Sequence, residues 1–309
     1  RTELLIRFEK HRDSAMHFSF LCLLTRLVSD DQMEARDLAS TASQPAADRD
    51  WYVTRHGQTM AIIRGPRAFL MGTAVGQPGF EISEKQHEVK IDWTFAISTT
   101  EVTLEQFRHH WMRYQGDTAA PGSEQNPVTE FDFQSVMEYC NRLSEHEQIR
   151  EDQYCYLRLP GGKLEAAPDF LKRSGYRLPS EWEWECAARA ETTTLRYDGY
   201  GSQFVGSFAW YEDNADQRLQ PVGQLLPNEF GLFDVYGNAS ELCQDEYNSK
   251  DSAAEPNFRS DGNPYRARRG GNVTSKWYDL RSASRSSAYQ ESMLPHWSFR
   301  ICRTLPGAD

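Results

Sequence analysis

The sequence predicts an irregular, loop-rich α+β fold for residues 51–309, with a short helical segment before it. After Trp51, short apolar runs typical of β-strands alternate with connections rich in Gly, Pro and Asn. Only three stretches of this region have a helical pattern, and residues 191–309 have almost none. An apolar fraction of 39% in a chain of 309 residues is sufficient for a sizeable core.

Residues 1–40 form the predicted helical segment. They contain no Gly or Pro, and their apolar residues recur at three- and four-residue spacing. The segment is either the end of a helical repeat or upstream domain, or an extension that packs on the main domain. Residues 41–50 are small, polar and contain Pro45, which predicts a linker. Because the chain starts at Arg1 without a Met, we expect it to be part of a longer protein.

Two stretches after the linker predict strands, and three predict helices. The runs "MAIIRG" and "HEVKIDWTFAIS" have the β-like texture. In "TLEQFRHHWMRY", Thr103 and Gln106 predict a capping box at a helix start, as do Ser180 and Glu183 in "PSEWEWECAARA". The middle helix follows Asp132 and has one apolar face formed by Val136, Tyr139, Cys140 and Leu143.

Charge and hydropathy exclude some classes of partner. The net charge of −11 would repel a phosphate backbone, so we expect no nucleic-acid partner. The longest apolar run, residues 18–28, is interrupted by Arg26 and is too short to span a bilayer. We therefore expect no membrane partner and a cytoplasmic location.

The cysteines and histidines lack metal-binding spacing. The six cysteines include no CxxC pair, and several lie in apolar patterns, so we expect reduced and buried thiols. The eight histidines are scattered, with no HxH or HExxH. His109 and His110 fall on a polar helix face, where we expect both to be solvated. The sequence therefore gives little support for a zinc site or a catalytic histidine.

Four stretches in fixed order carry a family resemblance. They resemble the formylglycine-generating enzyme (sulfatase-modifying factor) family, whose fold is a variant of the C-type lectin fold, over about residues 51–305. The resemblance implies an irregular α+β domain with Ca²⁺ in its loops. The stretches are "RGPRAFLMGT", "FAISTTEVTLEQF", "YRLPSEWEWECAARA", and "NEFGLFDVYGNASELCQD" followed by "RRGGN", "RSASR" and "SFRICR".

The resemblance also implies an activity that the residues do not support. A typical enzyme of the family oxidises a cysteine of a sulfatase peptide to formylglycine, using O₂ and a copper ion held by two cysteines shortly after Arg-Gly-Gly-Ser. The corresponding residues 272–280 read "NVTSKWYDL" and contain no cysteine. Cu(I) prefers thiolate ligands, which Ser275 and Lys276 cannot replace. We therefore expect no copper site and a domain that is not catalytic. Related sulfoxide synthases use an N-terminal histidine motif, which His11 and His17 do not reproduce.

A calcium site is the one cofactor that the resemblance predicts here. Its metal residues correspond to Asp234, Gly237, Ala239 and Glu241 in "FDVYGNASEL". Carboxylates and backbone carbonyls form the all-oxygen shell that Ca²⁺ prefers. The alternative is that the two acids only cap a turn. A second family calcium loop would fall in residues 210–223, where the spacing departs from the family pattern.

A candidate binding surface lies in residues 274–278 and 286–297. In the C-type lectin-like fold this region faces the ligand, and it is diversified in retroelement-driven variable proteins. Aromatic rings among small polar residues are typical of a recognition surface; the alternative is that they fold inward. The candidate ligand-binding residues are Thr274, Lys276, Trp277, Tyr278, Tyr289, His296 and Trp297.

The C-terminal arginines have two interpretations. Arg269, Arg281, Arg285 and Arg300 are expected to tie loops to carboxylates and carbonyls, since a planar guanidinium forms several hydrogen bonds at once. The alternative is that they join the neighbouring arginines in a basic patch for an anionic ligand.

These observations predict a ligand- or protein-binding sensor module of a larger bacterial protein. It would bind a protein or peptide and would be fused to, or associated with, an effector of the kinase, protease or NTPase type. The alternative is a formylglycine-generating-type oxidoreductase that acts on a sulfatase cysteine. Glycan binding rests only on analogy of fold.

Overall fold

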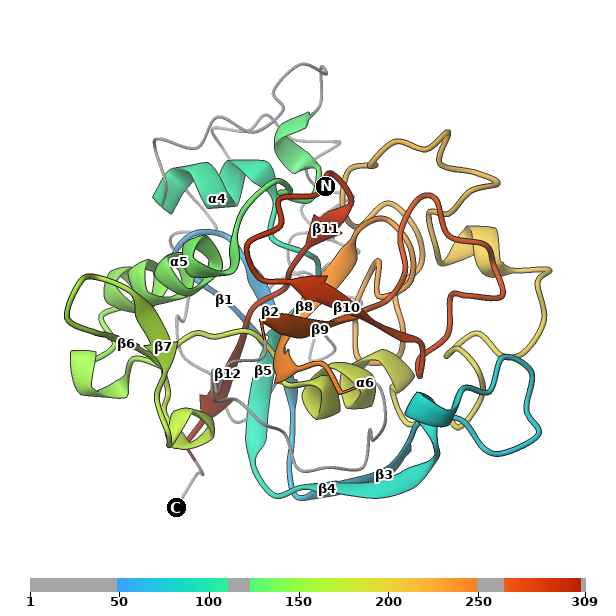
Figure 1. Cartoon of the computed structure of the whole chain (residues 1–309), viewed down its shortest axis with the longest axis horizontal. Helices are drawn as coiled ribbons and strands as arrows, with labels where there is room; N and C mark the ends of the chain where they lie inside the picture. The colour runs from blue at the N-terminus through green and yellow to red at the C-terminus, as the bar shows by residue number, and fades with distance from the viewer. Residues whose placement is uncertain (1–48, 111–122, 249–263, 307–309) are drawn as a thin grey trace.

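The structure, a computed structural model, describes residues 49–110, 123–248 and 264–306. The helical segment predicted for residues 1–40, and nearly all of the predicted linker, lie outside these residues. Within them the chain has three α-helices and twelve strands, which confirms the α+β prediction (Figure 1).

The first sheet is antiparallel and has the order β1-β2-β5-β12. Alternate residues of β2 face two different hydrophobic clusters: Met60 and Ile62 lie in one, Ala61 and Ile63 in the other. Both faces are therefore buried, which explains why residues 60–63 of this strand are all apolar. The strands are β1 (Trp51–Val53), β2 (Thr59–Ile63), β5 (Thr94–Ser98) and β12 (Cys302–Leu305).

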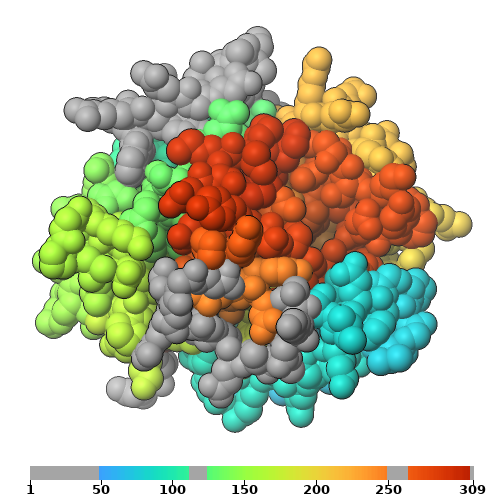
Figure 2. Space-filling view, in the orientation of Figure 1, coloured from blue at the N-terminus to red at the C-terminus, as the bar shows by residue number. Residues whose placement is uncertain are grey.

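The second sheet has the order β10-β9-β8-β11 and carries the C-terminal loops. Its strands are antiparallel except that β11 runs parallel to β8. Residues of its C-terminal strands and loops occupy the middle of the face shown in Figure 2. The strands are β8 (Ser240–Glu246), β9 (Tyr265–Arg269), β10 (Arg285–Tyr289) and β11 (Trp297–Ser298). Two hairpins complete the strands: β3 (Arg67–Met71) with β4 (His87–Ile91), and β6 (Tyr156–Arg158) with β7 (Leu164–Ala166).

The three helices begin where the sequence predicts. Thr103 and Gln106 exchange the two hydrogen bonds of a capping box, and Ser180 and Glu183 do the same. Asp132 caps the middle helix by accepting from the Ser135 amide. The helices are α4 (Leu104–His110), α5 (Phe133–His146) and α6 (Glu181–Arg189).

Helices α4 and α5 pack on one face of the first sheet, and α6 lies on the other side, beneath the second sheet (Figure 1). The apolar face predicted for α5 is buried in the first cluster. Residues 191–239 contain no α-helix, as predicted, and they also contain no strand. The short 3₁₀ helices are η1 (Ile82–Glu84), η2 (Ser123–Gln125), η3 (Glu151–Gln153), η4 (Phe170–Lys172) and η5 (Val205–Ser207).

Buried ion pairs connect the second sheet to α6. Glu181 pairs with Arg269 and Arg285, and Glu185 pairs with Arg189 and Arg269. In each pair, the opposite charge of the partner offsets the cost of removing the group from water. Two further pairs join Arg281 to Glu84 and Arg300 to Glu241. The expected scaffold role of Arg269, Arg281, Arg285 and Arg300 is therefore confirmed.

The prediction that His109 and His110 are both solvated is only half correct. His109 is exposed, but His110 is 4% exposed and its ring lies edge-on to the buried Tyr139 ring. His110 is the last residue of α4, and α5 packs against this helix and removes the ring from water. The prediction that His110 is solvated is therefore wrong.

The five cysteines within the described ranges are all free and buried, as predicted; Cys22 lies outside those ranges. Among the same residues, no helix combines the length and the apolarity needed to cross a membrane.

Candidate functional site

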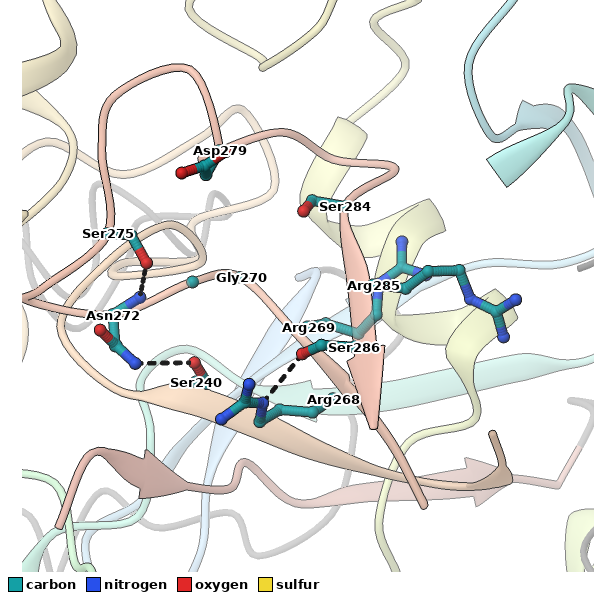
Figure 3. Close-up of a pocket in the computed structure, with 11 residues that line it drawn as sticks. Ser240, Arg268, Arg269, Gly270, Asn272, Ser275, Asp279, Ser284, Arg285 and Ser286 are labelled. Atoms are coloured by element: carbon teal, nitrogen blue, oxygen red, sulfur yellow. Dashed lines mark hydrogen bonds between the residues drawn. The ribbon is translucent and has the colours of Figure 1, made fainter. Parts of the chain in front are cut away.

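A polar pocket opens between the end of β9, the loop that follows it, and β10 (Figure 3). Its volume of about 130 Å³ is well below the roughly 300 Å³ typical of a site for a whole small molecule. The pocket is large enough for one side chain or a few waters. It is lined by Ser240, Arg268, Arg269, Gly270, Gly271, Asn272, Ser275, Asp279, Ser284, Arg285 and Ser286.

Two glycines turn the chain at the edge of the pocket. Gly270 and Gly271 have φ angles of 89° and 72°, in the left-handed region that favours glycine. A Cβ on Gly270 would lie 2.8 Å from the carbonyl oxygen of Val235. The Gly-Gly sequence is therefore needed for β9 to turn into the pocket loop.

Asn272 holds the pocket loop in one shape. Its side-chain oxygen accepts from the backbone amide and the hydroxyl of Thr274. Its backbone amide donates to the Ser275 hydroxyl at 2.9 Å. The Ser275 carbonyl accepts from the amide of Glu212, in a separate loop. These bonds order the loop before any ligand arrives, which reduces the entropy lost on binding.

Arg268 is the one pocket arginine without a carboxylate partner among the described residues. Its Nε donates to the Ser286 hydroxyl at 3.0 Å (Figure 3), and its guanidinium lies over the Trp297 ring at 4.8 Å. Burial without a compensating anion lowers the pKa of Arg268 to about 10. Arg269 and Arg285 also line the pocket, but Glu181 and Glu185 occupy their guanidinium groups. Arg268 therefore presents an uncompensated positive charge to the pocket.

The aromatic residues predicted for the binding surface divide into two groups. Trp277, Tyr278 and Tyr289 are 36%, 49% and 39% exposed, and the first two rings contact each other edge-on. His296 and Trp297 are half-buried, and Trp297 packs against the first hydrophobic cluster.

The remaining two predicted residues, Thr274 and Lys276, are exposed in the pocket loop. The loop that carries them also carries Trp277 and Tyr278 along one side of the pocket, while β10, on the other side, ends at Tyr289. The predicted surface and the pocket are therefore continuous. Ser286 lies within the surface predicted from the sequence, whereas Ser240 was missed because a serine in a strand has no distinctive pattern.

None of the pocket residues is a cysteine. The described thiols lie in the core, where burial raises their pKa values, for Cys155 and Cys186 to about 12. A buried thiol with a raised pKa is a poor nucleophile and a poor metal ligand, because both roles need the thiolate.

The predicted calcium residues are buried, and they differ in what they already bind. Glu241 uses both carboxylate oxygens in an ion pair with Arg300, and one of them also accepts from the Trp184 indole at 2.7 Å. Asp234 accepts from the Gly223 amide through one oxygen, while its other oxygen has no partner in the described part of the chain. Glu241 therefore has less capacity for a cation than Asp234.

Glu101, which the sequence did not indicate, adds a second unpartnered carboxylate. It is fully buried, and neither carboxylate oxygen has a hydrogen-bond partner in another described residue. Burial and the nearby charges of Asp234 and Glu241 raise the pKa of Glu101. Within the described residues, the carbonyls of Gly237 and Ala239 also accept no hydrogen bond. Unpartnered buried oxygens of this kind fit a hard cation such as Ca²⁺.

The two sheets, the helix arrangement and the loop-borne pocket define a C-type lectin-like α+β domain. The chain matches the sulfatase-modifying factor enzyme 1-like domain over residues 52–305 and belongs to that family.

The curated relatives of this chain have names that indicate different functions. It is 30% identical to a chaperone protein LppX of Paenibacillus barcinonensis, with 53% of this chain and 66% of that protein covered. It is 31% identical to a serine/threonine-protein kinase pkn1 of Chlamydia pneumoniae, with 58% of this chain and 32% of the kinase covered. A formylglycine-generating enzyme of Thermomonospora curvata is 33% identical, with 26% and 31% covered. The chain thus spans between about a third and two thirds of the length of these relatives.

Solved structures of the same fold are similar over most of the chain. Treponema denticola variable protein 1 superimposes with a TM-score of 0.67 at 21% identity, with 80% of this chain and 95% of that chain covered. PvdO from Pseudomonas aeruginosa gives a TM-score of 0.65 at 21% identity, with 82% and 98% covered. At this level of identity the similarity shows the fold alone.

Proposed function

We propose that this domain is a non-catalytic recognition module that binds a protein or peptide through the C-terminal loop surface. The surface comprises the pocket and the exposed rings of Trp277, Tyr278 and Tyr289. The observation that carries the proposal is Arg268, a partly buried cation with no carboxylate partner in the described residues.

The chemistry of Arg268 indicates the kind of group that enters the pocket. A guanidinium binds a carboxylate through two parallel hydrogen bonds, and this pairing is stronger where water is excluded. No described residue accepts from the two terminal nitrogens of Arg268. An acidic side chain or a peptide C-terminus is therefore the preferred occupant.

The dimensions of the site favour a large ligand over a metabolite. The pocket accepts about one side chain, whereas the exposed aromatic rings lie outside it on the loop and strand that border it. A peptide or protein contacts both elements at once, with rigid rings that lose little entropy on binding.

The relatives support a role within a larger protein. The kinase of Chlamydia pneumoniae is about three times as long as the part that this chain covers. We propose that the domain positions or regulates an effector to which it is fused or bound, of the kinase, protease or NTPase type.

The test begins with peptides selected from a random display library against the purified protein. We expect enrichment of Asp, Glu or free C-termini. Arg268→Gln should weaken binding of a selected peptide by about tenfold or more, because a charge-assisted bond is worth about 1.5–3 kcal/mol. Trp277→Ala should also weaken binding.

The controls are Arg158→Gln and Leu157→Ala on β6, where both residues are exposed and away from the C-terminal sheet (Figure 1). Both should leave the affinity unchanged. Equal binding by the Arg268 and Arg158 variants, or a selection without acidic enrichment, would refute the role given to the pocket.

A calcium ion is proposed as the structural cofactor beside this surface. Asp234 and Glu101 would supply carboxylate oxygens, and Gly237 and Ala239 carbonyl oxygens, with Glu241 held nearby by Arg300. When bound, the ion would supply positive charge that orders the loop from Asp234 to Ala239.

The alternative function is an oxidoreductase of the formylglycine-generating type. It is favoured only by family membership. It requires an accessible thiol pair, and no described cysteine lines the pocket.

A further inference from the structure

Four histidine rings from three separate segments converge on the side of the molecule where α4 and α5 pack. His56 lies in the turn between β1 and β2, His109 and His110 end α4, and His146 ends α5. The His56 ring lies 4.5 Å from that of His109, 4.6 Å from that of His110 and 5.1 Å from that of His146, centroid to centroid. The rings of His110 and His146 are 4.7 Å apart.

Ring nitrogens of His56, His110 and His146 lie within 4.8 Å of one another. Ligand nitrogens about 2.0–2.1 Å from a tetrahedral zinc ion lie roughly 3.4 Å apart. A small inward rotation of the rings about their side-chain bonds therefore brings all three to coordination distance. His146 is exposed and His56 half-buried, so two of the three rings border solvent and can adjust.

His110 provides an independent indication of a ligand. The ring is almost fully buried, yet neither of its nitrogens has a hydrogen-bond partner in the described residues. Buried polar atoms without a partner destabilise the folded state. A bound cation would give one nitrogen a partner.

His56 and His110 are in the protonation state that a metal needs. Burial, and then the neighbouring histidines, lower the pKa of His56 to about 4 and that of His110 to about 3. Both rings are therefore neutral at pH 7 and offer a lone pair to a cation. Arg55 and Arg142 are nearby positive charges, but an acid contacts each of these residues. Glu147 accepts from the Arg55 backbone amide, and Glu138 pairs with Arg142.

The helix dipole of α5 also favours a cation beside His146. His146 is the last residue of this 14-residue helix, and a helix C-terminus carries a partial negative charge. A cation held by His146 lies at that end, where the charge interaction is favourable.

We propose that His56, His110 and His146 bind a divalent transition-metal ion, with His109 at the open side as a fourth imidazole. A set of imidazoles without thiolate or carboxylate suits Zn²⁺, Cu²⁺ or Ni²⁺ and discriminates against Ca²⁺ and Mg²⁺. The site lies on the helical side of the first sheet and is separate in its residues from both the C-terminal surface and the proposed calcium site.

The test is calorimetric titration of the tag-free, chelator-treated protein with Zn²⁺. We expect one Zn²⁺ per chain, with no competition from Ca²⁺. The exposed His146 is the first residue to change: His146→Ala should weaken binding about tenfold or more, and His109→Ala/His146→Ala should abolish it. Co²⁺ should give the visible absorption of a tetrahedral site in the wild type and lose it in the double variant.

Matched controls separate this site from other ligands in the chain. His87→Ala changes a histidine bonded to its own hairpin through the Lys85 carbonyl, and His11→Ala/His17→Ala removes the N-terminal histidines. Both should retain wild-type affinity. Thermal unfolding without metal should show that His146→Ala is folded. Absence of Zn²⁺ uptake by the wild type, or undiminished uptake by the double variant, would overturn the proposal.

Discussion

The carboxylates of α6 and the side chains of Glu101 and His110 are all buried, but they differ in their partners. Glu181, Glu183 and Glu185 each meet one or two arginines. The side-chain polar atoms of Glu101 and His110 have no hydrogen-bond partner within the described residues. The first arrangement holds the fold together, whereas the second costs stability unless a ligand compensates it. We therefore propose that unpartnered buried groups such as these mark the ligand sites of the domain.

The largest effect is expected from the α6 network. Arg269 pairs with both Glu181 and Glu185, so Arg269→Leu leaves two buried carboxylates short of a partner. We expect a loss of about 3–5 kcal/mol in the free energy of unfolding, measured by urea denaturation. A loss below about 1 kcal/mol would show that the network does not hold the fold.

Asp245 is the carboxylate of this network without an arginine partner, and it predicts a pH dependence. Burial and the charge of Glu181 raise its pKa to about 8. The folded state therefore keeps a proton that the unfolded chain releases near pH 4. This group's contribution to stability is greatest at low pH and is lost as the pH rises from about 4 to about 8.

Asp245→Asn keeps an acceptor for the Glu181 amide and removes the titration. We expect the variant to match the wild type near pH 4 and to exceed it by about 1–3 kcal/mol at pH 8.5. Unfolding curves across this range provide the measurement, and parallel curves for the two proteins would contradict the assignment.

Glu101 should tolerate a neutral substitution, in contrast to Arg269. Glu101→Gln removes a buried acid whose side-chain oxygens have no hydrogen-bond partner among the described residues, so stability without Ca²⁺ should stay equal or rise by about 1 kcal/mol. The variant should also lose most of the rise in Tm that Ca²⁺ gives the wild type. Equal calcium responses in the two proteins would exclude Glu101 from the site.

A surface pair gives the smallest effect. Arg64 and Asp50 are joined at 2.9 Å, but each side chain is more than half exposed. Arg64→Ala should therefore change the free energy of unfolding by less than about 0.5 kcal/mol. A larger change would contradict the view that the ion pairs of α6 contribute more to the free energy of unfolding because they are buried.

The sequence indicated what depends on local pattern. The capping pairs Thr103–Gln106 and Ser180–Glu183 lie three residues apart, and the apolar face of α5 follows helical periodicity. Family motifs added the fold; the ligand-binding role of the loop surface stays a prediction.

The missed features depend on tertiary contacts. Arg268 and Arg269 are neighbours, yet they project to opposite faces of β9, and only Arg269 reaches α6. His56, His110 and His146 come from a turn and two helix ends, with no fixed spacing between them. Only the folded chain brings such residues together.

The central claim is that this domain recognises a ligand and performs no thiol oxidation. The most direct measurement is mass spectrometry of a Cys-x-Pro-x-Arg peptide incubated with the purified protein, copper and O₂, beside an active formylglycine-generating enzyme. We expect the peptide mass to remain unchanged with this protein while the enzyme converts it. Conversion of the peptide cysteine to the aldehyde by this protein would contradict the claim.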